Sequence, residues 1–520
     1  MTAANQTLLS KWMPLIIILL AAIVFDQLFH DRALGVNLFL FHVLIIGLIV
    51  QRVGWRAVSI PARWAGVGAL IAVSMVVVHH SIIAGFMAIV SIGLFAALAH
   101  ESALRSVPFG YLQLAANYIM LPVAAVEGTG ELIRGNGGTR AGWRWIRLVL
   151  IPLAVALIFF QLYRVGNPKF DQLTAGFLDG FFQAIGDLLE WIFTPHALFF
   201  IWGAIVCAGL IFRFAPRLVP QWEEPCSDLL KRVRSQRPHW MAPRSMDPLE
   251  RERRMGMVLL VLVNALLLAV NVIDISWVWI GFEVPENFSL KQFVHEGTWI
   301  LIISIFLSML ILLHLFRRNQ NFYVRSAWLR ILGLVWVGQN LVLGVSVFLR
   351  NYHYISFHGL AYKRIGVIAF LVLVLIGLIT LYIKILKRRS LFYLARVNAW
   401  AAFALLIGMT TVDWDSFIVR TNLRHSNPGE IDIDNYLAMS DKVLPLLYAN
   451  LDLVQEQMAR HSTNRVRWVE HLDPVAFRAD LDAKRDRFLL RIQEQHWQEW
   501  NMADVRTRTE LAELSAVGTP

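Results

Sequence analysis

Cysteine and charged residues are both scarce in this chain. Only 2 of the 520 residues are Cys, which excludes a disulfide framework as the basis of the fold. Charged residues make up 16%, against about 25% in a typical globular protein. Apolar residues instead reach 57%, and the mean hydropathy is +0.55. A soluble domain has too little interior to bury so many apolar side chains, so the composition excludes a soluble or disordered chain.

The sequence motifs of common enzyme classes are also missing. The chain contains no GxxxxGK[ST], HExxH, CxxC or GxSxG pattern. The glycine-rich run GTGELIRGNGGTRAG lacks the Lys-Ser/Thr end that reaches phosphates and Mg²⁺, so we interpret it as a linker. The histidines show no recurring metal-ligand spacing. The sequence therefore predicts no cofactor and no metal site, and it leaves open whether the protein is an enzyme.

What the chain does contain is a series of long apolar runs. Crossing a bilayer as a helix takes about 20 mostly apolar residues. We find eleven candidate spans, at roughly 13–28, 35–51, 65–79, 81–99, 145–163, 195–213, 256–280, 298–316, 330–349, 365–384 and 397–412. The pattern predicts an all-α integral membrane protein with about 11 transmembrane helices.

The basic residues predict the orientation of these spans. Lys and Arg concentrate in the short loops on the cytoplasmic side of membrane proteins. With the N-terminus inside, strict alternation puts the Arg- and Lys-rich loops QRVGWRAVSIPAR, FRRNQNFYVRSAWLR and ILKRRSLFYLAR in the cytoplasm, together with the long loop 214–255. An odd number of spans then leaves the C-terminal tail outside. We predict an N-in, C-out protein.

The segments divide into four parts. Residues 1–213 form an N-terminal membrane part of about six helices, and residues 256–412 form a C-terminal membrane part of about five. The basic cytoplasmic loop 214–255 separates them. The tail, residues 413–520, has helical periodicity and predicts a small helical extracytoplasmic domain.

Two further segments are amphipathic rather than uniformly apolar. Residues 168–193 combine Phe and Trp with spaced acidic residues, and residues 107–133 have a similar character. Both predict helices that lie in a membrane interface, the first on the outer side and the second on the inner side.

The net charge of +11 does not require a nucleic-acid partner. From Glu430 onward the tail holds 16 acidic and 11 basic residues, so the rest of the chain carries all of the positive excess. That excess lies mostly on the predicted cytoplasmic loops, where anionic lipid accounts for it. Membrane lipid is the expected partner, and nucleic acid is not.

The seventh and ninth predicted spans contain amide and carboxylate side chains, each of which needs a physical reason. They are Asn264, Asn271 and Asp274 in the seventh span, and Gln339 and Asn340 in the ninth. The spacings in the seventh span put its three residues near one helical face. Hydrogen bonds between helices would explain the amides. The Asp274 carboxylate must be paired, hydrated or protonated.

The predicted outer ends of the C-terminal spans are unusually polar. The connection between the ninth and tenth spans is basic, against the charge bias of the other outer loops. Arg presents a planar fork suited to carboxylate or phosphate, which makes an anion site a candidate. Snorkelling to headgroups is the alternative. The ligand-binding candidates are Arg350, His353, Tyr362, Arg364, Arg420, Asn422 and His295. The acid–base candidates are Glu296, Asp413 and Asp415.

Residues of about 251–450 resemble a known family. The matching stretches include ERERRMGMVLLVLVNALLLAVNVID, FVHEGTWILI, RNYHYISFHGLAYKRIGV, DWDSFIVRTNL and IDIDNYLAMSDKVLPLL. They are similar to bacterial multi-pass membrane families known as domains of unknown function 4153 and 4173. The resemblance implies the bacterial inner membrane and brings no activity with it.

Three functional hypotheses remain open. The first is an envelope component for binding, sensing or scaffolding, with an anion-facing polar site on its outer face. Its partners would be an anionic lipid or glycan there, or a protein bound through the tail or the 214–255 loop. The second is a membrane-embedded transferase or hydrolase acting on a lipid-linked anionic substrate. The third is a transporter whose path passes Asp274, Gln339 and Asn340.

Overall fold

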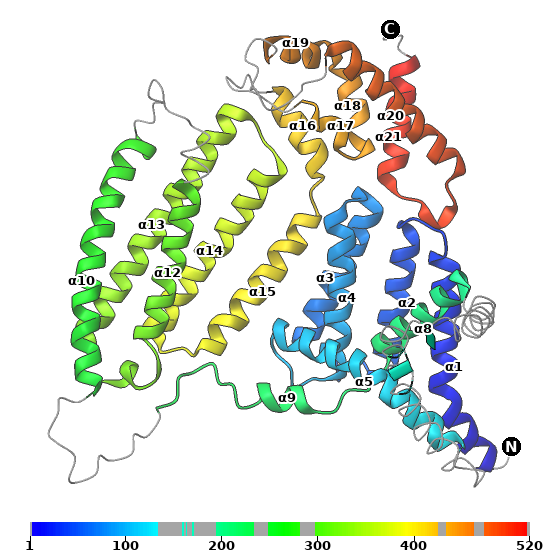
Figure 1. The fold of residues 1–520 in the computed structure, drawn as a ribbon, viewed down its shortest axis with the longest axis horizontal. Helices are drawn as coiled ribbons and strands as arrows, with labels where there is room; N and C mark the ends of the chain where they lie inside the picture. Colours follow the sequence, from blue (N-terminus) through cyan, green and yellow to red (C-terminus); the bar gives the residue numbers. More distant parts are fainter. Residues whose placement is uncertain are drawn as a thin grey trace. The chain divides into compact units, whose positions relative to one another are not determined.

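The structure is a computed structural model, and it describes most of the chain. The described residues are 3–133, 194–232, 248–280, 297–424, 433–461 and 473–516, with six single residues between 156 and 170. They form helices and, within these ranges, no β-strand (Figure 1). Two compact units divide the chain. Unit 1 comprises Met1–Val67, Val90–Leu104 and Phe109–Gln221, and unit 2 comprises Gly68–Ile89, Arg105–Pro108 and Trp222–Pro520.

Unit 1 is built from long helices that small residues allow to approach one another. Its helices are α1 (Ala3–Phe29), α2 (Val36–Val53), α5 (Val107–Ile133) and α8 (Pro195–Ile211), with the first part of α3 (Ile60–His79) and the second part of α4 (Ile82–His100). A Cβ on Gly203 of α8 would lie 2.3 Å from the Phe25 ring of α1. Close backbone approach of this kind is typical of membrane helix packing.

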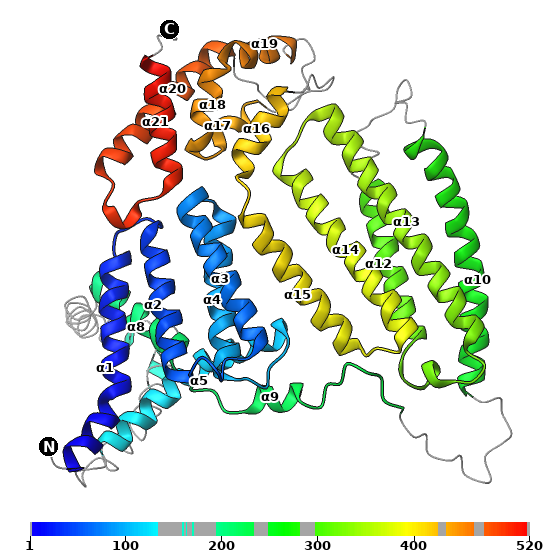
Figure 2. The ribbon, with the colours of Figure 1, turned by 180° about the vertical axis from the view of Figure 1, so that it is seen from behind.

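The membrane part of unit 2 is a set of long apolar helices. It contains α10 (Pro248–Asp274), which continues as the π-helical turn η2 (Ile275–Trp279), then α12 (Thr298–Leu315), α13 (Ala327–His358), α14 (Tyr362–Lys387) and α15 (Leu391–Thr410). Figures 1 and 2 show α13 beside α10, α12 and α14. Fully buried Leu260, Leu312, Leu329, Leu343 and Leu378 belong to their shared core.

The expected spans agree well with these helices. Within the described ranges, nine helices are long and apolar enough to cross a membrane: Trp12–Phe29, Val36–Val53, Ile60–His79, Ile82–His100, Pro248–Trp279, Thr298–Leu315, Ala327–His358, Tyr362–Lys387 and Leu391–Thr410. The expected span at 195–213 is the shorter apolar helix Pro195–Ile211. The expected span 145–163 and the amphipathic segment 168–193 lie outside the described residues, apart from single positions.

The polar loop that we expected between the ninth and tenth spans is mostly helix. Helix α13 continues to His358 and α14 begins at Tyr362, so only three residues connect them. Gly359 makes this tight reversal possible because its φ of +81° is one that residues with a Cβ rarely adopt. The polarity of residues 350–358 therefore marks the last turns of a helix rather than a loop.

The C-terminal module, residues 413–516, is helical as expected from its periodicity. It consists of α16 (Trp414–Arg424), α17 (Asn435–Ala438), η5 (Asp441–Val443), α18 (Leu444–Ala449), α19 (Leu451–His461), α20 (Pro474–Glu494), η6 (Trp497–Glu499) and α21 (Met502–Ala516). The Asp473 side chain caps α20 by accepting hydrogen bonds from the N–H groups of Val475 and Ala476.

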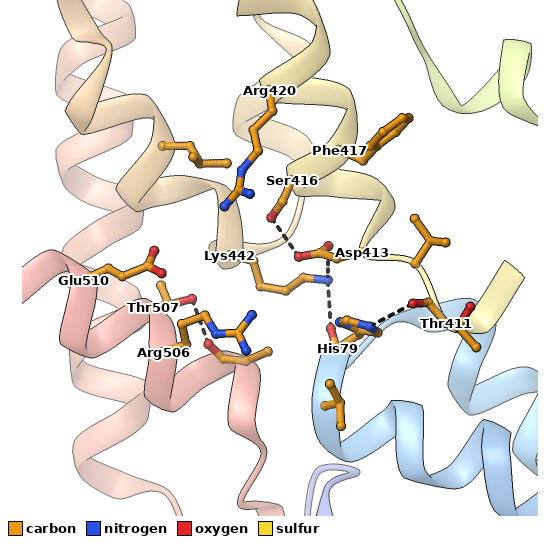
Figure 3. A pocket seen from close by; sticks show the side chains of 14 residues that line it. His79, Thr411, Asp413, Ser416, Phe417, Arg420, Lys442, Arg506, Thr507 and Glu510 are labelled. Carbon is orange, nitrogen blue, oxygen red and sulfur yellow. Dashed lines mark hydrogen bonds and ion pairs between the residues drawn. The ribbon is translucent and has the colours of Figure 1, made fainter.

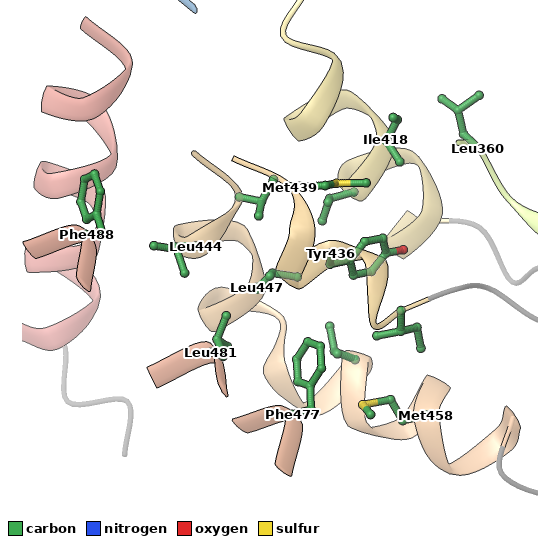
Figure 4. Close-up of a cluster of buried hydrophobic side chains, with 14 of the residues drawn as sticks. Leu360, Ile418, Tyr436, Met439, Leu444, Leu447, Met458, Phe477, Leu481 and Phe488 are labelled. Atoms are coloured by element: carbon green, nitrogen blue, oxygen red, sulfur yellow. The ribbon is translucent and has the colours of Figure 1, made fainter. Parts of the chain in front are cut away.

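This module has its own hydrophobic core (Figure 4). Tyr436, Phe477 and Phe488 are almost completely buried in it. Burying each such aromatic side chain contributes on the order of 2–3 kcal/mol. Leu360 and Ile365, from the α13–α14 turn and the start of α14, belong to the same cluster. The module is therefore packed onto that turn.

Two polar contacts of unit 2 lie at the same end of its long helices. The imidazole of His353, in α13, lies 3.0 Å from the carbonyl oxygen of Val278, in η2. The amide of Asn422, in α16, is hydrogen-bonded to the backbone of Leu360 in the α13–α14 turn. The end of α10, the α13–α14 turn and the C-terminal module thus lie together, as the alternation of spans requires.

Candidate functional site

A polar seam connects α10 to α13. Asn264, Asn271 and Asp274 are all buried on one face of α10, as their spacing predicts. The Gln339 amide donates a 2.7 Å hydrogen bond to Asn264 Oδ1, and Asn264 Nδ2 donates to the carbonyl of Leu332. Asn271 Nδ2 donates to the carbonyl of Gln339. These bonds are the interhelical contacts that we considered for the amides.

Asp274 is paired, and its partner is Arg350. The distance between Arg350 Nη2 and Asp274 Oδ1 is 2.6 Å, and the two side chains are only 8% and 5% exposed. The Asn340 amide bonds within its own helix, to the carbonyl of Trp336. His353 contacts Val278 as described above. The seam therefore uses the polar groups of Asn264, Asn271, Asp274, Gln339 and Arg350 to join helices.

Two other ligand candidates stabilise the α13–α14 turn. The Arg364 guanidinium donates to the carbonyls of His358 and Gly359 and lies 4.6 Å from the centre of the Tyr354 ring. Asn422 Oδ1 accepts a hydrogen bond from the backbone N–H of Leu360, and Asn422 Nδ2 donates to the backbone carbonyl of Leu360. His295 and Glu296 lie outside the described residues.

The two remaining acidic candidates surround Lys442, a residue that the sequence analysis did not single out. Lys442 Nζ lies 2.9 Å from Asp413 Oδ1 and 3.5 Å from Asp415 Oδ2, and the lysine side chain is only 8% exposed. It also donates to the carbonyl of His79 at the end of α3. One ammonium group therefore ties α16, η5 and α3 together.

Hydrogen bonds occupy the rest of both carboxylates. Ser416 donates to Asp413 Oδ2 at 2.7 Å, and Tyr362 and Ser440 donate to the two oxygens of Asp415. Burial alone would raise the pKa of Asp413, but Lys442 and Ser416 together lower it below the ordinary value. A carboxylate with a lowered pKa is a weak base, which disfavours Asp413 as a general base.

A pocket of about 340 Å³ opens beside this network (Figure 3). The ends of α3 and α15, together with α16, η5, α18 and α21, form its walls. Its lining consists of Val78, His79, Thr411, Val412, Asp413, Ser416, Phe417, Arg420, Lys442, Leu446, Ala503, Arg506, Thr507 and Glu510. Asp413 and Arg420 are the two sequence-predicted site residues that line it.

Two arginines of the pocket lining are not paired with a carboxylate among the described residues. Figure 3 shows the guanidinium groups of Arg420, from α16, and Arg506, from α21, directed toward the pocket near Lys442. Among the described residues neither forms an ion pair, whereas the charge of Lys442 is already balanced by Asp413 and Asp415. Glu510 is the remaining acid of the lining. The arrangement can hold an anion with more than one acceptor oxygen.

The turn between α3 and α4 contributes a histidine to the same pocket. His79 ends α3, lines the pocket, and places Nε2 3.1 Å from the carbonyl oxygen of Thr411. The next residue, His80, has a φ of +44°, so the helix stops there. Within the described ranges, no three His, Cys, Asp or Glu side chains gather as metal ligands.

The sequence alone gave little reason to select Lys442, Arg506 or Glu510. All three lie in the tail, where acidic and basic residues are mixed. The stretch that contains Lys442, IDIDNYLAMSDKVLPLL, carried part of the family resemblance, and this was the available signal. Their convergence with Arg420 depends on how α16 and α21 pack, which no local pattern encodes.

The described helices define a multi-pass helical membrane protein with a helical C-terminal module. The profile of a family described as a domain of unknown function (DUF4153) matches residues 65–450, so the chain belongs to this family. The match begins well before residue 251, where the resemblance in the sequence started. It includes Asp413, Arg420 and Lys442 and ends before Arg506. No curated protein and no solved structure matches the chain.

Proposed function

We propose that this protein is a cell-envelope component of the bacterial inner membrane that binds an anionic ligand in the pocket between α16 and α21. The C-terminal module would lie on the outer face, as the charge bias of the loops predicts. One observation carries the proposal: Arg420 and Arg506 face the same pocket without a carboxylate partner among the described residues. Two such groups can hold a phosphate or carboxylate through several charge-assisted hydrogen bonds.

Binding is better supported than acid–base catalysis. Lys442 forms ion pairs with the carboxylates of Asp413 and Asp415. Asp413 also accepts a hydrogen bond from Ser416, and Asp415 accepts hydrogen bonds from Tyr362 and Ser440. For Asp413 these contacts hold the pKa below its ordinary value, which makes proton abstraction harder, and the oxygens of Asp415 are occupied by the hydroxyl groups of Tyr362 and Ser440. The network instead joins α16 to η5 and to the end of α3 in the pocket wall, so that α16 and Arg420 are held in place.

The pocket can be tested with pyrophosphate as a probe. The full chain, purified in an uncharged detergent, should bind pyrophosphate in isothermal titration, and affinity should fall as NaCl screens the exposed guanidinium groups. Arg420→Gln and Arg506→Gln should each weaken binding about tenfold, since charge-assisted hydrogen bonds are lost.

Each variant has a matched control on the same helix. Arg424, on α16, and Arg508, on α21, do not line the pocket, so Arg424→Gln and Arg508→Gln should bind as the unchanged protein does. Pyrophosphate affinity that is insensitive to the Arg420→Gln, Arg506→Gln double variant, or to salt, would reject the proposal.

A further inference from the structure

The pocket lies beside the ends of two helices of membrane-spanning length. Helix α3 has 20 residues and ends at His79, and α15 has 20 residues and ends at Thr410. A helix of this length spans about 30 Å, the thickness of the hydrocarbon core. In a bilayer that these two helices cross, His79 and Thr411, which line the pocket, would lie where the acyl region gives way to headgroups.

Part of the pocket lining is apolar. Val78, Val412, Phe417 and Leu446 contribute to the lining, and the Phe417 side chain is 49% exposed. A small free anion would make no use of these groups. An amphiphile whose charged end reaches the arginines would cover them with its glycerol and acyl chains.

Glu510 requires an explanation in a pocket that otherwise favours anions. Its carboxylate shares α21 with Arg506 and lines the same pocket. A second negative charge disfavours a bare phosphate, but it favours a ligand that carries a hydrogen-bond donor next to its phosphate. Ethanolamine ammonium and glycerol hydroxyl groups are such donors, whereas the quaternary ammonium of choline has no N–H.

We infer that the pocket binds the headgroup of a membrane phospholipid, with the phosphate between Arg420 and Arg506 and a donor group beyond it at Glu510. This inference rests on the proposed anion-binding function and adds the class of ligand. Phe417 then contacts the part of the lipid next to the phosphate. A free phosphate ester offers the same phosphate group as the lipid headgroup. Binding of the lipid and binding of the free ester must therefore be compared directly.

The test compares a lipid with its own headgroup. The full chain in an uncharged detergent is incubated with dihexanoylphosphatidylethanolamine or with glycerophosphoethanolamine, and bound ligand is counted by native mass spectrometry. The lipid should bind at least tenfold more tightly. Phe417→Ser should remove most of this difference and leave pyrophosphate affinity unchanged, because the arginines remain.

The outcomes separate the two proposals. If pyrophosphate binds through Arg420 and Arg506 but lipid and headgroup bind equally well, the lipid assignment is overturned and the anion site stands. If Phe417→Ser leaves the preference for lipid intact, the assignment is also overturned. If neither pyrophosphate nor lipid binds, both proposals fail.

A second comparison addresses Glu510. Dihexanoylphosphatidylethanolamine should bind about tenfold more tightly than dihexanoylphosphatidylcholine, since only the former donates a hydrogen bond to the carboxylate. Glu510→Gln should bring the two affinities close together, while Glu513→Gln, on the same helix and outside the lining, should not. Equal affinities in the unchanged protein would overturn the role of Glu510.

Discussion

Arg350 and Asp274 form an ion pair between α13 and α10, near the end of the membrane helices that faces the C-terminal module. Their charged atoms are 2.6 Å apart, and both side chains are less than 10% exposed. Either charge alone would be costly in this environment, because desolvation in a buried site amounts to several kcal/mol per ion. The two helices are therefore interdependent at this level.

A double-mutant cycle should detect that dependence. Arg350→Met and Asp274→Leu should each destabilise the protein by about 3–5 kcal/mol, and their effects should couple by about 1–3 kcal/mol, because the second substitution removes the charge that the first leaves unpaired. Unfolding by SDS in mixed micelles gives the free energies. The exposed pair Arg485 and Asp486 should couple by less than about 1 kcal/mol. Additive effects at Arg350 and Asp274 would contradict the pairing.

The amide contacts between α10 and α13 should be weaker. Asn264→Leu and Gln339→Leu should couple by about 0.6 kcal/mol and at most about 1.7, the range measured for interhelical hydrogen bonds in membranes. The same unfolding assay applies. Asn340 is the control, because its amide bonds to Trp336 within α13 and should not couple to Asn264.

Removing the Lys442 ammonium should destabilise the C-terminal module in a pH-dependent way. Lys442→Met leaves Asp413 and Asp415 without their cation and should cost about 2–4 kcal/mol at pH 7, less than a fully buried pair because Asp413 is 23% exposed. In the unchanged protein the pKa of Asp413 is lowered. Its contribution to stability is therefore present at a pH above its pKa in the unfolded chain, and it is lost as the pH falls through its pKa in the folded protein.

The variant should show the opposite trend in mild acid. Without Lys442 the pKa of Asp413 should rise, because burial raises it and the attraction that opposed burial is lost. The stability difference between Lys442→Met and the unchanged protein should therefore shrink from pH 7 to pH 5 in thermal melts. Adding Asp413→Asn should restore part of the loss at pH 7. A difference that is constant with pH would argue against an electrostatic role.

The sidedness of the C-terminal module can be checked with reporters. Alkaline phosphatase fused after Pro520 should be active, since it folds only outside the cytoplasm, and green fluorescent protein at the same point should stay dark. Fusions in the basic loop 214–255 should give the reverse pattern. Phosphatase that is inactive at the C-terminus would place the pocket in the cytoplasm and overturn the outer-face proposal.

Hydropathy predicted most of the fold because a bilayer leaves few solutions. Uncharged runs of about 20 residues must be helical to satisfy their backbone, so even the short candidates at 35–51 and 397–412 proved to be helices. The exception was the polar segment after Arg350, interpreted as a loop. Its polar side chains form contacts between helices, so their polarity did not indicate where the chain reverses. Gly359 marks that reversal.

The candidate site could be predicted only in part. Asp413 and Arg420 were selected because they follow a span, and they do line the pocket. Arg350, Arg364 and Asn422 were selected on the same grounds and serve helix packing and a turn. What separates the two groups is tertiary contact between α16 and α21, which lie about 80 positions apart in the chain. No periodicity reports contacts at that separation.

The Asn422 side chain has a mechanical consequence. Its side-chain oxygen accepts from the N–H of Leu360 and its side-chain NH₂ donates to the C=O of Leu360. One side chain therefore binds both backbone groups of Leu360 in the α13–α14 turn. Arg420 is two residues earlier on the same helix. A rotation of α16 that brings Arg420 closer to a ligand in the pocket must either break both of these hydrogen bonds or move the α13–α14 turn as well. Movement of that turn also moves the ends of α13 and α14.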